Sequence, residues 1–281
     1  MASRPRSGAR LIVLEERIRT ALVLGVVLVV VLFALPVWAT LLVITVAILA
    51  GAWEWSAFIG VDGRVAGGAR AAYVALVAVA LAALSLPRPP LVADYAVLAL
   101  AIGWWVVAFL WVVLAPGAAP RPAGALAGLL TLVPAWFSLV HLRLDFAAGA
   151  EWLLFLLILV TATDSGAYFT GRRFGRVKLA PRVSPGKTWE GVIGGFAAGC
   201  LAAWAGAGWF HLPVLPFLLL AVTVIVFSIV GDLTESLLKR RAGVKDSGAL
   251  FPGHGGMLDR IDSLTAAAPV LLAGLQVLGV T

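Results

Sequence analysis

Long apolar runs without charge dominate the sequence, and short polar segments separate them. Runs such as LVLGVVLVVVLFAL lack the strict alternation of a half-buried strand, so they favour helices over a β-barrel. A helix needs roughly 20 mainly apolar residues to cross the hydrocarbon core of a bilayer. The pattern therefore predicts nine spanning helices, near residues 19–37, 39–60, 70–86, 91–115, 124–142, 151–170, 191–210, 213–231 and 263–280.

Composition agrees with a membrane location. Hydrophobic residues make up 62% of the chain and charged residues 12%, and the mean hydropathy is +1.04. One soluble core of 281 residues could not hide so much apolar surface, so we expect an all-α, polytopic integral membrane protein. The first apolar run exceeds the ~7–15 residues of a signal-peptide core, and WAT at 38–40 is a poor cleavage site. We therefore interpret this run as the first span.

The distribution of basic residues predicts the orientation. Lys and Arg are retained on the cytoplasmic side of membrane proteins. If the N-terminus is cytoplasmic, 19 of the 21 Lys and Arg residues lie on the inner side, and only Arg88 and Arg143 lie outside. The net charge of +7 then reflects membrane topology and does not indicate nucleic acid. A basic inner face also attracts anionic lipid headgroups and nucleotides.

Polar residues divide the chain into two regions. Residues 1–150 have short loops, which indicates a transmembrane scaffold, whereas residues 151–281 contain two longer inner loops, at 171–190 and 232–262. Asp164 lies late in the span before the first loop, where an isolated acid costs a few kcal/mol and usually serves a function. We expect the catalytic region, if there is one, on the cytoplasmic side between these loops.

The first loop contains SPGKTWEG, which partly resembles a phosphate-binding P-loop. Pro181 stands where that motif requires glycine, and a membrane helix precedes it, so a P-loop NTPase is rejected. Ser184 and Thr188 can cap a helix that begins near Trp189, and the free N–H groups there, with Lys187, favour a phosphate. Capping alone explains the serine and threonine equally well.

The second loop brings acids and bases together. In GDLTESLLKRR, helical spacing places Asp232, Glu235 or Ser236, and Lys239 along one face. A simple pairing of Glu235 with Lys239 would leave Asp232 unexplained, because it directly follows an apolar run.

A glycine-rich segment then leads into MLDRID. It would let backbone N–H groups approach a ligand, although a plain flexible loop would have the same glycines. In MLDRID, Asp259 and Asp262 share one helical face. Acids at both ends of a loop suggest a hard cation such as magnesium, held by one or two carboxylates, water and phosphate oxygens. His254 has no second His or Cys at the spacing of a zinc site.

These segments resemble the signature of the phosphatidate cytidylyltransferases, also called CDP-diacylglycerol synthases. The resemblance rests on SLLKR from 236, KD at 245–246 and PGHGGMLDRID at 252–262. Two upstream stretches of that family are also similar to SPGKTWEG and DSGAY…GRRFG. Its N-terminal half has a looser similarity to AWEWSAF around Glu54. The similarity covers residues 150–265 well. Gly186 stands where relatives often have a second lysine.

The resemblance implies a reaction and its setting. Members of the family condense CTP with phosphatidic acid to give CDP-diacylglycerol and pyrophosphate. They are homodimers in the bacterial inner membrane, they act on its cytoplasmic side, and they use magnesium. The acid of the GD pair and the first acid of DR-x-D form the cation centre, which implies Asp232 and Asp259 here. A second, monovalent cation, potassium, has been associated with the family site.

We therefore assign two groups of candidate residues. The candidate catalytic residues are Asp232, Lys239, Arg240, Lys245, Asp246, His254, Asp259, Arg260 and Asp262. The candidate substrate-binding residues are Asp164, Ser184, Lys187, Thr188, Ser236, Gly253, Gly255 and Gly256. Within these groups, the resemblance makes Asp232 and Asp259 the metal ligands, and His254 either assists the leaving pyrophosphate or only hydrogen-bonds it.

Two other functions remain open. A related enzyme could use an ether lipid or another lipid phosphate as the acceptor, since the signature reports nucleotide and metal chemistry better than the tails. A secondary transporter would also have many spans, but it should show broken helices or repeats near the midplane.

Overall fold

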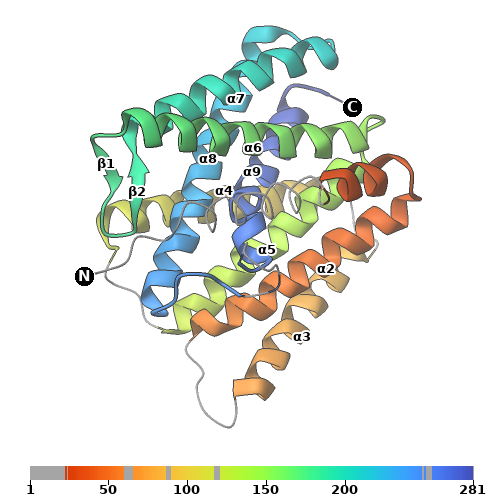
Figure 1. Ribbon diagram of the computed structural model, residues 1–281. Coiled ribbons are helices and arrows are strands. Elements are labelled where there is room, and N and C mark those ends of the chain that lie inside the picture. Colours follow the sequence, from red (N-terminus) through yellow and green to blue (C-terminus); the bar gives the residue numbers. More distant parts are fainter. Residues whose placement is uncertain are drawn as a thin grey trace.

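The computed structural model describes residues 23, 25–59, 66–86, 90–116, 121–248, 250 and 255–280. Nearly all of these residues form long helices (Figure 1). The helices are α2 (Val37–Trp55), α3 (Ala66–Ser85), α4 (Pro90–Leu114), α5 (Arg121–Leu144), α6 (Gly149–Phe174), α7 (Trp189–Trp209), α8 (Val214–Arg241) and α9 (Leu258–Val277). Residues 25–33 are also helical, and a short 3-10 helix, η1 (Ser56–Ile59), follows α2. The expected all-α architecture is confirmed.

Seven of the described helices, α2 to α8, are long and apolar enough to cross a membrane. The last helix, α9, is not among them because its first five residues include Asp259, Arg260 and Asp262. The first predicted span, 19–37, lies partly outside the described residues, so the count of nine stays a prediction. Pro36 separates the helix at 25–33 from α2, because proline cannot continue a helical hydrogen-bond ladder.

The most buried helix is α9, which lies in the middle of the bundle (Figure 1). It contacts α2, α4, α5, α6 and α8. Ala266, Ala267 and Ala268 are fully buried along it, and small side chains let helices pack closely. Beside the first turns of α9, a Cβ on Gly231 of α8 would lie 2.7 Å from the Asp262 carbonyl oxygen. A glycine at this position therefore lets α8 approach the polar end of α9.

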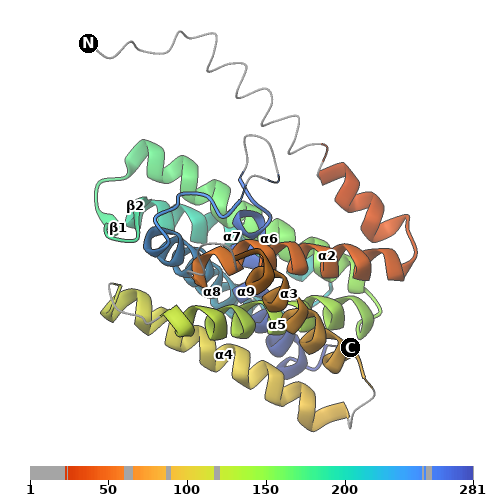
Figure 2. The same cartoon turned by 90° about the horizontal axis from the view of Figure 1, so that it is seen from below.

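On one side of the bundle, α6 and α7 pack together with a small hairpin, and α4 lies on the opposite side (Figure 2). The hairpin consists of β1 (Lys178–Ala180) and β2 (Ser184–Thr188), which pair antiparallel. The hydropathy pattern predicted a loop over 171–190, and this was wrong: α6 continues to Phe174 and the hairpin fills much of the rest. With three residues, β1 is too short for alternation to be visible in the sequence.

The second inner loop is also shorter than predicted. The apolar pattern placed 232–262 in a loop, but α8 continues through Arg241, and α9 begins at Leu258. The reason is that hydropathy marks where the apolar surface ends, whereas the backbone hydrogen bonds continue into the polar region. Asp232 and Lys239 are thus fixed on a helix.

Candidate active site

Asp232 is held between α8 and the hairpin. The Nζ atom of Lys187, on β2, lies 2.6 Å from Oδ2 of Asp232. The hydroxyl of Ser236, one helical turn further along α8, donates to Oδ1 at 3.3 Å. The hairpin therefore places Lys187 against Asp232, the acid that follows the apolar part of α8.

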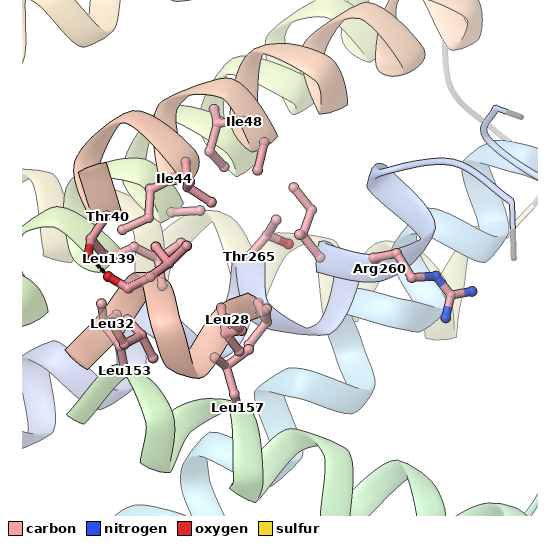
Figure 3. Close-up of a pocket in the computed structure, with 16 residues that line it drawn as sticks. Leu28, Leu32, Thr40, Ile44, Ile48, Leu139, Leu153, Leu157, Arg260 and Thr265 are labelled. Atoms are coloured by element: carbon pink, nitrogen blue, oxygen red, sulfur yellow. Dashed lines mark hydrogen bonds between the residues drawn. The ribbon is translucent and has the colours of Figure 1, made fainter. Parts of the chain in front are cut away.

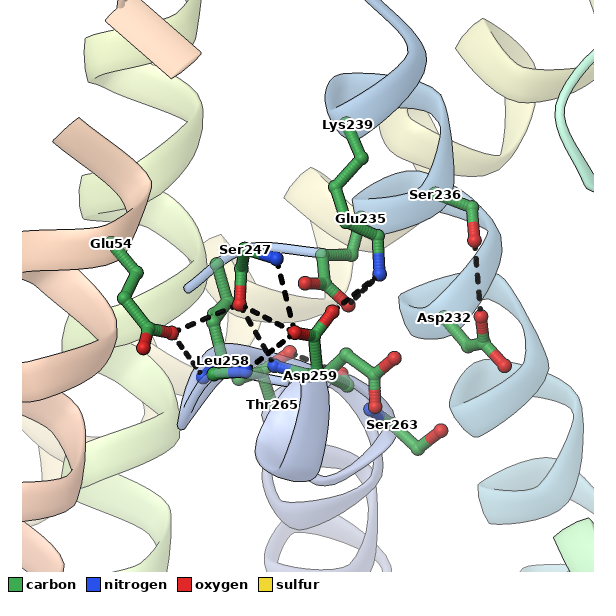
Figure 4. A network of polar contacts seen from close by, with 12 residues as sticks. Glu54, Asp232, Glu235, Ser236, Lys239, Ser247, Leu258, Asp259, Ser263 and Thr265 are labelled. Carbon is green, nitrogen blue, oxygen red and sulfur yellow. Dashed lines mark hydrogen bonds and ion pairs between the residues drawn. The ribbon is translucent and has the colours of Figure 1, made fainter. Parts of the chain in front are cut away.

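Asp259 has the densest set of contacts in the site (Figure 4). Lys239 Nζ donates to its Oδ1 at 2.7 Å. Its Oδ2 accepts from the backbone N–H of Gly256 at 2.8 Å and from the N–H and hydroxyl of Ser247 at 3.0 and 2.9 Å. Burial opposes ionisation, but Lys239 and the two N–H groups outweigh it and lower the pKa of Asp259. This carboxylate, outside the seven apolar spans, is therefore held ionised.

Two further acids lie behind the lysine. Oε2 of Glu235 is 3.3 Å from Lys239 Nζ, so the predicted i,i+4 pairing of these residues is confirmed. Asp262, one turn into α9, lies beside Glu235 and accepts from the Ser263 N–H at 2.7 Å. Lys239 thus faces acids from both α8 and α9.

Asp164 joins this cluster from α6. It lies within electrostatic range of Asp232 and Asp262, and of the cations Lys187 and Arg260. The structure therefore brings together candidates from the C-terminal halves of α6 and α8, from β2 and from the start of α9. The sequence predicted this grouping between the two polar segments.

Not every candidate has the environment that the sequence predicted. Ser184 begins β2 opposite Ala180 and does not cap a helix, because α7 starts five residues later. Thr188 does cap α7: its hydroxyl oxygen accepts from the Gly191 N–H at 3.2 Å. Gly256 was expected to offer its N–H to a ligand, but here it donates to Asp259.

The remaining candidates lie in or beside the segment between α8 and α9. Gly255 has a positive φ of 80°, a conformation that favours glycine. The side chains of Arg240, Lys245 and Asp246 are exposed. Gly253 and His254 lie outside the described residues.

The chemistry of the donor set fits magnesium. Carboxylate oxygens are its preferred protein ligands, and water and phosphate oxygens usually complete its shell. Asp232 and Asp259 each already contact a positive Nζ atom, so both carboxylates lie in places that attract a cation. Within the described part of the chain, no three His, Cys, Asp or Glu side chains form a metal-binding group by themselves. Two carboxylates with substrate oxygens match the observed arrangement better than an all-protein cage.

Sequence reasoning missed Glu54 and Ser247 as parts of this site. Glu54, near the end of α2, is 8% exposed and accepts from the Ser247 hydroxyl at 2.9 Å. It also accepts from the backbone N–H groups of Met257 and Leu258 at 2.9 and 2.7 Å. The signal was available, because Glu54 is a single acid in the apolar stretch AGAWEWSAF, as Asp164 is in its own span.

An apolar cavity of about 220 Å³ adjoins the site (Figure 3). It lies between residues 25–33, α2, α5, α6 and α9, and its lining includes Leu28, Ile44 and Leu157. Its two hydroxyls are already bonded: Thr40 donates to Val31 O and Thr265 to Asp262 O. The stem of Arg260 lines one end, and its guanidinium points away from the apolar interior (Figure 3).

Comparison with known proteins agrees with this architecture. Residues 15–278 match the cytidylyltransferase family. The phosphatidate cytidylyltransferase of Pseudomonas aeruginosa is 45% identical over 275 residues, which cover 95% of this chain and 98% of that protein. The phosphatidate cytidylyltransferase of Haemophilus influenzae is 46% identical over 188 residues, 60% of this chain and 64% of that protein. That of Brucella suis is 51% identical over 140 residues, 48% of this chain and 50% of that protein.

The long apolar helices define an integral membrane protein, and the polar cluster formed by α6, α8, β2 and α9 is its candidate site. The match over most of its length identifies the family: this chain belongs to the cytidylyltransferase family.

Proposed function

We propose that this protein transfers a cytidylyl group from CTP to phosphatidic acid and releases CDP-diacylglycerol and pyrophosphate. The observation that carries the proposal is the convergence of Asp164, Asp232 and Asp259 with Lys187 and Lys239 where α6, α8, β2 and the start of α9 meet. It occurs in a chain 45% identical to a phosphatidate cytidylyltransferase over 95% of its length. A site of this kind suits a polyanionic nucleotide at a membrane surface.

The reaction needs positioning and charge neutralisation more than covalent help from the protein. An oxygen of the lipid phosphate attacks the α-phosphorus of CTP. A new P–O bond forms as the bond to the bridging oxygen of the β-phosphate breaks, and pyrophosphate leaves with that electron pair. Alignment of the two phosphates and stabilisation of the charge supply most of the rate in such transfers.

Asp232 and Asp259 are the residues that would hold magnesium. When bound, magnesium neutralises charge on the triphosphate. Lys187 and Lys239 each pair with one of these acids, and a phosphate oxygen would offer each lysine an alternative partner. Arg240, Lys245 and Arg260 add positive charge on the exposed side of the same helix ends.

The lipid substrate would approach from the bilayer. The apolar cavity beside Arg260 can take part of an acyl chain, because its lining is almost wholly aliphatic. The guanidinium of Arg260, directed out of that cavity, would meet the lipid phosphate. This arrangement lets the headgroup react while the tails stay in apolar surroundings.

The setting of the reaction is also proposed. The inner-side bias of 19 of 21 Lys and Arg supports a cytoplasmic site in a bacterial inner membrane. Homodimer formation and a potassium ion at the site rest on the family resemblance. Crosslinking in native membranes tests the dimer, and replacing potassium with sodium or choline in the assay tests the cation.

The deciding experiment measures pyrophosphate release by the purified protein with phosphatidic acid and CTP, with and without magnesium. We expect release only when all three are present, and none from Asp259→Asn. Absence of release from folded protein would contradict phosphatidate as the acceptor. Ether-linked and other lipid phosphates would then be tested, and failure of all of them would favour transport.

A further inference from the structure

The carboxylate of Glu54 caps α9 from another helix. The N–H groups of Met257 and Leu258 lie where a helix leaves its first donors without intrahelical partners. Glu54, on α2, accepts from both of them, at 2.9 and 2.7 Å. The negative carboxylate also lies at the positive end of the α9 dipole. The end of α2 therefore fixes the start of α9, although about 200 residues of sequence separate them.

Ser247 links this cap to the site. Its Oγ lies 2.9 Å from Oε2 of Glu54 and 2.9 Å from Oδ2 of Asp259. A serine hydroxyl has one proton, so it donates to one of the two carboxylates at a time. The backbone N–H groups of Ser247 and Gly256 hold Oδ2 of Asp259 in either case. The other oxygen, Oδ1, faces Lys239 (Figure 4).

Two glycines make room for the Glu54 carboxylate. A Cβ on Gly248 or on Gly256 would clash with its oxygens. Only glycine therefore lets these two backbone segments close around the carboxylate. The glycines near 256, which the sequence suggested for a ligand, here pack against a side chain of the protein itself.

We propose that Glu54 is a positioning residue for cytidylyl transfer. Through Ser247 and the first turn of α9 it fixes Oδ2 of Asp259, so that Oδ1 is presented to Lys239 and to the cation and nucleotide that replace it. This inference rests on the proposed function. It predicts that loss of the Glu54 charge disturbs the use of CTP and magnesium and leaves the lipid cavity intact.

The first test needs no activity. Hydrogen exchange is measured on metal-free, substrate-free protein carrying Glu54→Gln, a change that keeps size and removes charge. Peptides covering 245–258 should lose protection, because the N–H groups of Met257 and Leu258 lose a charged acceptor, while peptides of α5 should not change. The matched control is Glu151→Gln, which neutralises an acid in the first turn of α6. Unchanged exchange of 245–258 in Glu54→Gln would overturn the anchoring.

The second test separates positioning from simple stabilisation. Per folded molecule, Glu54→Gln should lower kcat by about 10–100-fold, the usual effect of losing a residue that orients a metal ligand. The magnesium and CTP requirements should rise, and KM for phosphatidic acid should not. Glu54→Asp, which keeps the charge, should recover part of the loss. A lower yield of folded protein with unchanged kcat and CTP dependence would overturn the positioning role.

Ser247→Ala keeps the backbone N–H that donates to Asp259 and removes only the hydroxyl that links Glu54 to Asp259. It should shift the magnesium requirement in the same direction as Glu54→Gln but less. The double variant should lose less than the product of the two single losses, because both act through Asp259. Independent, multiplying losses would overturn the linkage. Inactive wild-type protein would overturn the proposed function instead, and hydrogen exchange would still decide the anchoring.

Discussion

The two lysine–carboxylate pairs of the site have almost the same length but different surroundings. The distance from Lys187 to Asp232 is 2.6 Å, and these side chains are 27% and 26% exposed. Lys239 and Asp259 are 2.7 Å apart, and they are 12% and 9% exposed. Ser247 and Gly256 also brace Asp259, whereas Asp232 accepts a longer contact of 3.3 Å from Ser236 besides its lysine. The Nζ–Oδ distance alone therefore does not distinguish the two pairs, whereas burial and bracing do.

The difference in exposure indicates that the two pairs have different roles. The less exposed, braced pair holds one geometry, because moving either partner leaves a charge in a poorly solvated place. A pair that is about a quarter exposed exchanges partners at less cost, because water screens both charges. We therefore expect the Asp259 side to define the position of the reacting groups, and the Lys187 side to adapt when nucleotide enters.

The largest effects should come from the acids themselves. Asp232→Asn and Asp259→Asn should each lower turnover by about 10²–10³-fold or more, because each removes a charge that holds the cation and nucleotide. Only Asp259→Asn should also lower the melting temperature, since it weakens the buried pair. Pyrophosphate release and thermal unfolding in detergent measure the two effects. Retained turnover in either variant would contradict its assignment.

Replacing each lysine with methionine tests whether the two pairs differ in their contribution to stability. Lys239→Met leaves Asp259 and Glu235 without their cation and should destabilise the protein by about 3–5 kcal/mol, the cost of breaking a buried pair. Lys187→Met should change stability by less than about 1 kcal/mol. Equal melting temperatures for the two variants would show that the contrast in burial has no energetic meaning.

Lys187→Ala should act mainly on nucleotide binding. We expect KM for CTP to rise by about tenfold, the loss of one charge-assisted contact of roughly 1.5 kcal/mol, with a smaller change in kcat. Initial rates at varied CTP and saturating lipid measure this. An unchanged CTP dependence would leave Lys187 as only the partner of Asp232.

A substitution in the apolar cavity, outside both lysine–carboxylate pairs, should affect the lipid substrate and not the nucleotide. Leu157→Trp narrows the apolar cavity and should raise KM for phosphatidic acid severalfold without altering the dependence on CTP or magnesium. The control is Val226→Trp, in a different apolar pocket between α4 and α8. If the two variants behave alike, the cavity beside Arg260 is not selective for the lipid.

The smallest effect should come from Thr188→Ala. Loss of this cap costs about 1 kcal/mol and loosens the junction of β2 with α7, next to Lys187. KM for CTP should rise by a small factor, which initial rates at varied CTP measure. If Thr188→Ala shifted the magnesium requirement as much as Ser247→Ala does, the Lys187–Asp232 and Lys239–Asp259 pairs would not have separate roles.

The sequence predicted the helices better than the ends of the helices. Apolar length identifies a span because the bilayer imposes it, and the runs that became α2 to α8 were all recognised. The same criterion ended the eighth span at the first charge and so missed ten helical residues from Asp232 to Arg241. It also treated the hairpin as a loop, because two short strands carry no periodic signal.

Individual site residues were predictable where the chain is locally unusual. Asp164, Asp232 and Lys239 interrupt or follow apolar runs, and the structure brings them together. Glu54 is also a lone acid in an apolar stretch, but its role was missed because its partners Met257 and Leu258 are backbone groups from the far end of the chain. No pattern within a window of sequence reports such a contact, since it depends on how α2 and α9 pack.

The length of α8 has a consequence for the choice of membrane. A helix of 28 residues is about 42 Å long, whereas a bilayer core is about 30 Å thick. A span that exceeds its bilayer tilts or projects, and the depth of Asp232 below the headgroups changes with either response. Catalysis should therefore depend on bilayer thickness. Reconstitution in phosphatidylcholines of increasing chain length should give an optimum, at the thickness where the acids meet the phosphate plane.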